Sequence, residues 1–104
     1  MIVNLTPHTI NIHTGGGPVV SIQPSGLIAR VETKEMEDGE VEGIPVVRSR
    51  FGSPIGIPSP EPGVFFIVSR ILLDACRGRN DLLAPGPLIR DSEGRPVGCR
   101  GLSR

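Results

Sequence analysis

Residues 64–78 read VFFIVSRILLDACRG and open with the most hydrophobic segment of the chain. The first five residues are all β-branched or aromatic, a composition that favours a strand packed on both sides. Ser69 follows, and a serine hydroxyl at this position can accept a hydrogen bond from an unpaired amide in the first turn of a helix. The stretch therefore predicts a central strand followed by one short helix near residues 69–77.

Within the predicted helix, the spacing of apolar residues indicates which side faces the core. Ile71, Leu72 and Ala75 fall on one stripe, and Gly78 is a typical helix terminator. Elsewhere the core is predicted to be mostly sheet, because isoleucine and valine supply 21 of the 29 Ile, Val and Leu residues.

Glycine and proline, 14 and 11 residues, recur between the apolar segments and predict many turns. Residues 15–18, Gly-Gly-Gly-Pro, are interpreted as a loose hairpin loop rather than a phosphate loop, because neither Lys-Ser/Thr nor a helical pattern follows. A second hairpin is expected over residues 88–100, with its turn at residues 91–94. We therefore predict an α+β fold: one domain, residues 1–104, compact, antiparallel and β-rich, with about six or seven strands.

The middle of the chain predicts a charged hairpin. Residues 32–42 hold six acidic side chains and one lysine, which favours a solvated hairpin tip. Residues 44–51 are the expected return strand. In a regular strand, Arg48 and Arg50 lie on one face while Val47 and Phe51 lie on the other.

Charge and cysteine content exclude several classes of protein. Eleven basic and eleven acidic residues cancel, which argues against a protein that coats DNA or an anionic membrane. The longest apolar run, residues 64–68, is far too short to cross a bilayer, and no secretory signal is recognised, so we expect a cytoplasmic protein. Cys76 and Cys99 are then expected to be free thiols, and neither a metal nor a cofactor is predicted.

Three segments carry a family resemblance: Asn4-Leu5-Thr6-Pro7-His8 and residues 24–31 and 88–100. Together they resemble a family of small, functionally unassigned proteins of bacteriophages and prophages that have an N-terminal Asn-Leu-Thr-Pro-His motif. The resemblance covers nearly the whole chain and implies a phage or mobile-element setting inside a bacterial cell. It implies no activity and no catalytic residues.

Arginine dominates the basic residues, ten to one over lysine. The planar guanidinium grips phosphate in bidentate fashion, so this bias favours a phosphorylated ligand, although a GC-rich genome also replaces lysine by arginine. Clustering in the sequence selects five candidate phosphate contacts: Arg48, Arg50, Arg90, Arg95 and Arg100.

The remaining candidate contacts are polar or aromatic. Asn4, His8 and Asn80 are candidates for hydrogen bonds to a base or sugar. Phe65 and Phe66 face opposite sides of a strand, and Phe66 is taken as the stacking residue. With neither tyrosine nor tryptophan, an aromatic platform for single-stranded nucleic acid is disfavoured.

These features predict a non-enzymatic, homo-oligomeric binding protein. Its arginine-rich pockets at subunit interfaces would sequester a small anionic, nucleotide-derived immune signal, because a chain this small rarely encloses a deep pocket alone. Two alternatives stay open: a small phosphodiesterase or nucleotide hydrolase that uses His8 with an aspartate, and a phage structural or host-takeover protein that binds no small ligand.

Overall fold

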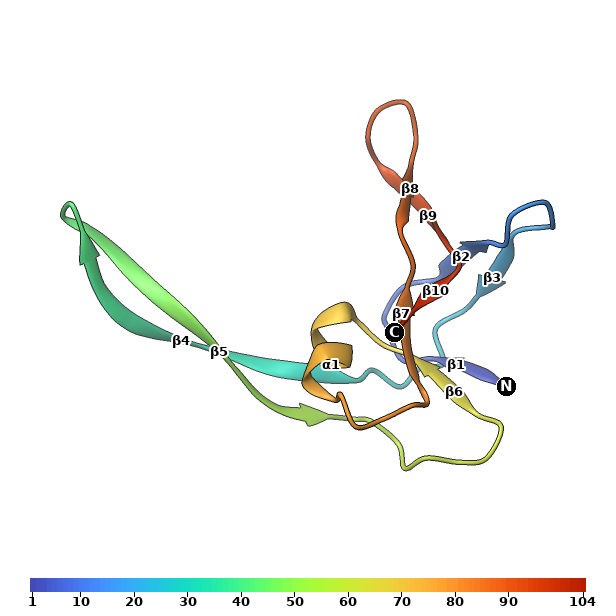
Figure 1. Ribbon diagram of the computed structural model, residues 1–104, viewed down its shortest axis with the longest axis horizontal. Coiled ribbons are helices and arrows are strands. Elements are labelled where there is room, and N and C mark those ends of the chain that lie inside the picture. The colour runs from blue at the N-terminus through green and yellow to red at the C-terminus, as the bar shows by residue number, and fades with distance from the viewer.

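The computed structural model describes all residues, 1–104, as ten strands in three sheets and one helix (Figure 1). The elements are β1 (Ile2–Asn4), β2 (Ile10–His13), β3 (Val20–Ile22), β4 (Arg30–Val41), β5 (Ile44–Ile55), β6 (Phe65–Ile67), α1 (Arg70–Ala75), β7 (Leu82–Pro85), β8 (Leu88–Arg90), β9 (Pro96–Arg100) and β10 (Leu102–Ser103). The α+β class is confirmed, with more strands than expected because several are only two to four residues long. Nothing helical in the structure has the length and apolarity needed to cross a bilayer.

The first sheet has the order β1-β6-β7-β10 and holds the core. β6 lies at its centre, as predicted, but pairs in parallel with both β1 and β7. The expectation of an antiparallel domain is wrong here, because α1 connects β6 to β7 as a crossover and so brings them side by side in the same direction. The core cluster consists of Leu5, Ala29, Phe66, Val68, Leu72, Leu73, Leu82 and Ala84.

The helix begins as predicted and buries a different stripe. The Ser69 hydroxyl accepts a hydrogen bond from the Leu72 amide at 3.3 Å. Leu72 and Leu73 are buried, whereas Ile71 is 54% exposed. Because α1 contacts both β7 and the base of β4 and β5, two adjacent leucines find apolar neighbours and Ile71 does not.

The second sheet has the order β3-β2-β9-β8 and contains both predicted hairpins, β2–β3 and β8–β9. A parallel pairing of β2 with β9 joins the two hairpins. This junction needs glycine at position 98, where a Cβ atom would stand 2.9 Å from the Asn11 carbonyl oxygen and 3.0 Å from the His13 ring.

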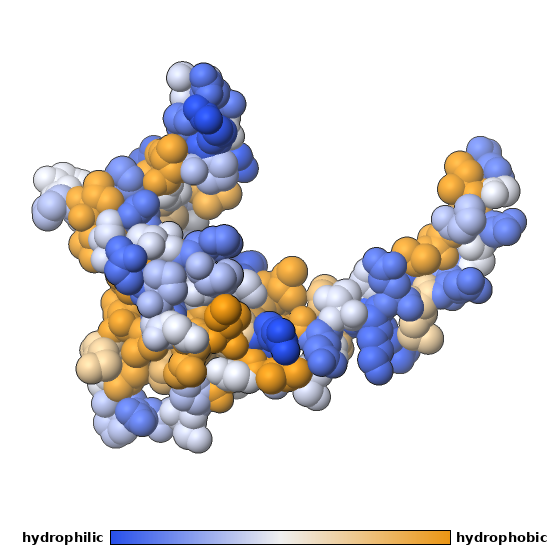
Figure 2. Space-filling view, turned by 180° about the vertical axis from the view of Figure 1, so that it is seen from behind, coloured by the Kyte–Doolittle hydropathy of each residue, from blue (hydrophilic) through white to orange (hydrophobic).

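β4 and β5 form a two-stranded arm, residues 30–55, that projects from the rest of the protein, here called the body (Figures 1 and 2). The acidic segment expected as a hairpin tip is mostly strand, because the chain reverses direction within two residues, Glu42 and Gly43. Their φ angles of 52° and 78° between the paired Val41 and Ile44 are those of a type I′ turn. The predicted compactness is also wrong: the radius of gyration is 16.7 Å, against about 13 Å for a compact domain of this size.

Candidate functional site

The second sheet separates an apolar face from a polar face. Paired residues in neighbouring strands point to the same face of a sheet. The pairing of Ile12 with Cys99 and of His13 with Arg100 therefore shows which residues belong to each face. The apolar face carries Ile10, Ile12, Leu88, Val97 and Cys99, and the polar face carries Asn11, His13, Ile89 and Arg100. Each face has a hollow large enough for a small molecule.

The polar face holds a hollow of about 580 Å³, which we call the glycine hollow. It is lined by His13, Thr14, Gly15, Gly16, Gly17, Ile89 and Arg100. Arg100 is exposed and pairs with no carboxylate. No backbone or side-chain hydrogen bond uses the N–H groups of the three glycines. A guanidinium, an imidazole and free amide N–H groups form a set of donors suited to an anion.

Sequence reasoning identified the parts of this hollow but not their association. The predicted hairpin loop is confirmed between β2 and β3, and Gly15 adopts a φ of +85° there. Arg100 reaches it only through the parallel pairing of β2 with β9, a contact between opposite ends of the sequence. The signal was the unusual run of three glycines, which a plain hairpin loop does not require.

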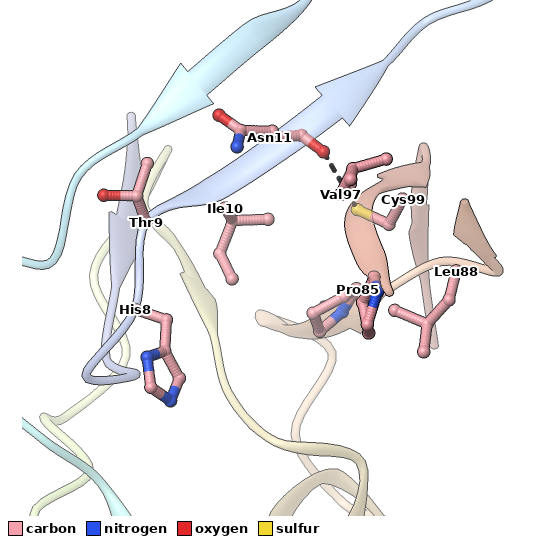
Figure 3. Close-up of a pocket in the computed structure, with 10 residues that line it drawn as sticks. His8, Thr9, Ile10, Asn11, Pro85, Leu88, Val97 and Cys99 are labelled. Atoms are coloured by element: carbon pink, nitrogen blue, oxygen red, sulfur yellow. Dashed lines mark hydrogen bonds between the residues drawn. The ribbon is translucent and has the colours of Figure 1, made fainter. Parts of the chain in front are cut away.

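The apolar face holds a second hollow of about 530 Å³, the apolar hollow (Figure 3). Ile10, Leu88, Val97 and Pro85 surround it, and His8 projects from the chain beside it. The buried Cys99 thiol donates to the Gly101 carbonyl oxygen at 3.4 Å and lies 3.6 Å from that of Asn11. Such walls suit an uncharged, apolar group.

Neither hollow offers His8 an acidic partner. No aspartate or glutamate lines the apolar or the glycine hollow, so the hydrolase alternative lacks the carboxylate that it requires next to His8. No group of three or more His, Cys, Asp or Glu side chains is placed to hold a metal ion.

Asn4, a candidate ligand contact, is 1% exposed and holds the bend between β1 and β2. Its amide nitrogen donates to the carbonyl oxygens of His8 at 2.7 Å and Ile22 at 3.1 Å. Its Oδ1 accepts from the Thr6 amide at 2.9 Å and from the Thr6 hydroxyl at 2.7 Å. The amide is fully used by the protein itself, so a ligand contact from Asn4 would break this network.

The five candidate arginines do not converge within one chain. Arg48 forms an ion pair with Asp38 at 3.3 Å, and Arg50 lies opposite Lys34 on the arm. The other three belong to the β8–β9 hairpin, which projects in a different direction from the arm (Figure 1).

Within the β8–β9 hairpin, two arginines serve the hairpin itself. Arg90 donates to the Gly94 carbonyl oxygen at 2.8 Å, and Arg95 pairs with Asp91 and Glu93. Arg100 is thus the one of the five that lines a hollow without a protein partner.

Phe66 is 4% exposed within the core cluster, so no face of its ring is available for stacking and we remove it from the proposed contacts. Phe65, 38% exposed, is the accessible member of the pair. The alternation of the strand was predicted correctly, but which side carries the core depends on α1, which packs with Phe66. Asn80 is exposed and lies next to Arg79, just before the start of β7.

Arg79 forms a two-pronged ion pair with Asp81 that the sequence analysis missed. Both N–H···O distances are 2.7 Å, and the guanidinium also donates to the Pro58 carbonyl oxygen at 2.9 Å. The hydrogen bond from Arg79 holds the pKa of Asp81 below its usual value and raises the pKa of Arg79. The contact ties the proline-rich loop to β7, a structural role, and Arg-x-Asp spacing was its only sequence signal.

Comparison with known proteins adds no relative: no family model, no curated protein and no solved structure matches the chain.

Proposed function

We propose that the protein is a non-enzymatic, homo-oligomeric binding protein that sequesters a small anionic, nucleotide-derived molecule of the kind used as an immune signal in bacteria. The observation that carries the proposal is the glycine hollow, about 580 Å³, which is lined by Arg100, His13 and three glycines whose N–H groups form no hydrogen bond within the chain. That volume is in the range of small-molecule sites.

The chemistry of the hollow favours capture over turnover. Its one charged side chain, Arg100, is a donor only, and no carboxylate lines the hollow to serve as a general base. Arginine binds a phosphate with two parallel hydrogen bonds, while backbone N–H groups can approach closely where glycine leaves no side chain in the way.

The hollow is open and shallow on one chain, which is why the proposal includes further subunits. Only 13 of 104 residues are buried, and many large apolar side chains remain exposed, among them Leu27, Ile28 and Leu88. Apolar exposure on this scale marks surfaces that associate. A second copy placed over the hollow would deepen it and add the base and sugar contacts that one chain lacks.

Depletion of nucleotides from solution tests the proposal. Purified protein is mixed with a panel of linear and cyclic mono- and dinucleotides, and bound material is released by heat and analysed by chromatography. Intact release is the expected result. Recovery of a cleaved product would establish the hydrolase alternative, and no depletion of any member would contradict ligand binding.

A lysine variant then tests the site. Arg100→Lys keeps the charge but loses the bidentate geometry, so we expect roughly a ten- to hundredfold loss of affinity for the depleted nucleotide, on the order of the 1.5–3 kcal/mol of a hydrogen bond to a charged group. The matched control is Arg77→Lys on the exposed surface of the helix end, where Arg77 pairs with Asp74. Equal binding by both variants would exclude Arg100 as a phosphate contact.

A further inference from the structure

The two faces of the arm carry opposite charges. The register pairs Lys34 with Arg50 and Met36 with Arg48, so these four side chains share one face. Strand alternation places Glu32 and Asp38 on the same face, where three basic side chains still outnumber two acidic ones. It also pairs Thr33 with Phe51, Glu35 with Ser49 and Glu37 with Val47, so these six share the other. We call the first the basic face and the second the acidic face.

Part of each set of charges forms no ion pair within the chain. On the basic face Asp38 pairs with Arg48 at 3.3 Å, which leaves Lys34 and Arg50 directly opposite one another with no acidic partner. On the acidic face Glu35 and Glu37 form no ion pair. Like charges directly opposite in a two-stranded sheet destabilise it, as Lys34 and Arg50 do on the basic face. The unpaired charges of the two faces have opposite signs, so the faces are complementary to one another.

The arm also exposes apolar side chains that nothing in the chain covers. Met36 on the basic face is 49% exposed, and Val47 and Phe51 on the acidic face are 54% and 56% exposed. Polar and apolar side chains alternate along the free length of the arm (Figure 2). An isolated two-stranded hairpin is marginally stable in water at best, and a third layer or strand is normally needed to support it.

We propose that the arms of two copies of this chain stack face to face, with the basic face of one copy on the acidic face of the other. Stacked sheets lie about 10 Å apart, which brings Lys34 and Arg50 of one copy over Glu35 and Glu37 of the second. The same contact covers Met36 with the apolar residues of the acidic face.

Steric demands set the relative orientation. The protein measures 22 Å along its shortest axis, wider than the spacing of two stacked sheets, so arms that point the same way would force the bodies together. Antiparallel arms place the two bodies at opposite ends of the stack. Contact between two different faces is a head-to-tail interface, so each copy keeps one face free for another.

The inference deepens the homo-oligomeric part of the proposed function by naming the surface and its partner, and it is tested without any nucleotide. Lys34→Glu/Arg50→Glu makes both faces acidic, and Glu35→Arg/Glu37→Arg makes both basic. Each double variant should have the mass of a monomer, 11.0 kDa, by light scattering at micromolar concentration, where the wild type has at least twice that mass. Lys34→Glu/Arg50→Glu retains a like-charged pair across the strands, so the hairpin itself is perturbed little.

Restoration of complementary charges is the decisive measurement. Mixing the two double variants should restore the larger mass. One variant has two acidic faces and the other has two basic faces, so the arm of one can stack on the arm of the other. The fourfold variant should self-associate as the wild type does. Glu40→Arg/Glu42→Arg, the same change in charge near the tip, is the matched control and should leave the mass unchanged.

Three results would overturn the inference: a monomeric wild type, double variants that keep the wild-type mass, or no recovery on mixing although both double variants are folded by circular dichroism. Nucleotide depletion by the same variants separates this inference from the proposed function. If Lys34→Glu/Arg50→Glu lost nucleotide binding while keeping its mass, Arg50 would be a ligand contact and arm stacking would be excluded. Arm stacking without any nucleotide depletion would support the proposed interface and contradict the proposed nucleotide sequestration.

Discussion

Replacing Asn4 by alanine tests whether this buried amide stabilises the fold. The side chain makes four hydrogen bonds, two as donor to carbonyl oxygens and two as acceptor from Thr6. At ~1 kcal/mol each, the four hydrogen bonds together contribute on the order of 4 kcal/mol. The Thr6 hydroxyl is near solvent and recovers water, so we expect a loss of about 3 kcal/mol in the free energy of unfolding.

The assay is thermal unfolding followed by circular dichroism. For a domain of this size 1 kcal/mol shifts Tm by roughly 4–8 °C, so Asn4→Ala should lower Tm by roughly 12–24 °C. Asn80→Ala, an identical substitution at an exposed side chain without a hydrogen bond, is the control and should shift Tm by no more than a few degrees. A decrease below about 4 °C for Asn4→Ala would refute the structural role and return Asn4 to the candidate ligand contacts.

Further predictions concern backbone packing and pH. Gly86→Ala should destabilise the protein by at least about 2 kcal/mol in chemical denaturation, because its Cβ would stand 2.0 Å from the Arg100 carbonyl oxygen. The control is Gly16→Ala, where the space around the Cβ is open. Equal stability of the two variants would contradict the close packing at Gly86. The depressed pKa of Asp81 stabilises the folded state above the usual value of 3.8, and this contribution is lost as the pH falls through the folded-state pKa. Between pH 5 and about pH 3, near the usual pKa range of aspartate, the Tm of the wild type should therefore fall further than the Tm of Asp81→Asn. Parallel curves of Tm against pH for the two proteins would count against the ion pair with Arg79.

Local features of the fold could be predicted from the sequence because their causes lie within a few residues. The strand at residues 65–67, the Ser69 cap, and the hairpins at residues 15–17 and 91–94 follow from side-chain type and turn chemistry. The alternation of Arg48 and Arg50 against Val47 and Phe51 is confirmed for the same reason.

Features that depend on distant pairings were not predictable. β1 pairs with β6 and β2 with β9, and nothing in the short strands themselves specifies a parallel partner so far along the chain. The candidate site was the hardest feature to predict, because Arg100 comes next to the glycine loop only through the pairing of β2 with β9. Phe66 was misassigned for a related reason: alternation separates two faces, but only packing decides which one is the core.

The parallel pairings also set an order of events during synthesis of the chain. β1 cannot complete its sheet until β6 has left the ribosome, and β2 must wait longer for β9. The arm closes through a two-residue turn and requires no distant partner, so it is free to form while Leu5 and Ile12 still lack the strands that bury them. Contacts this distant in sequence slow folding, since the loop between them must close before any stabilisation is gained. Both strands of the charged arm thus leave the ribosome well before the core can form, and that interval is when the new chain is most exposed to aggregation and proteolysis.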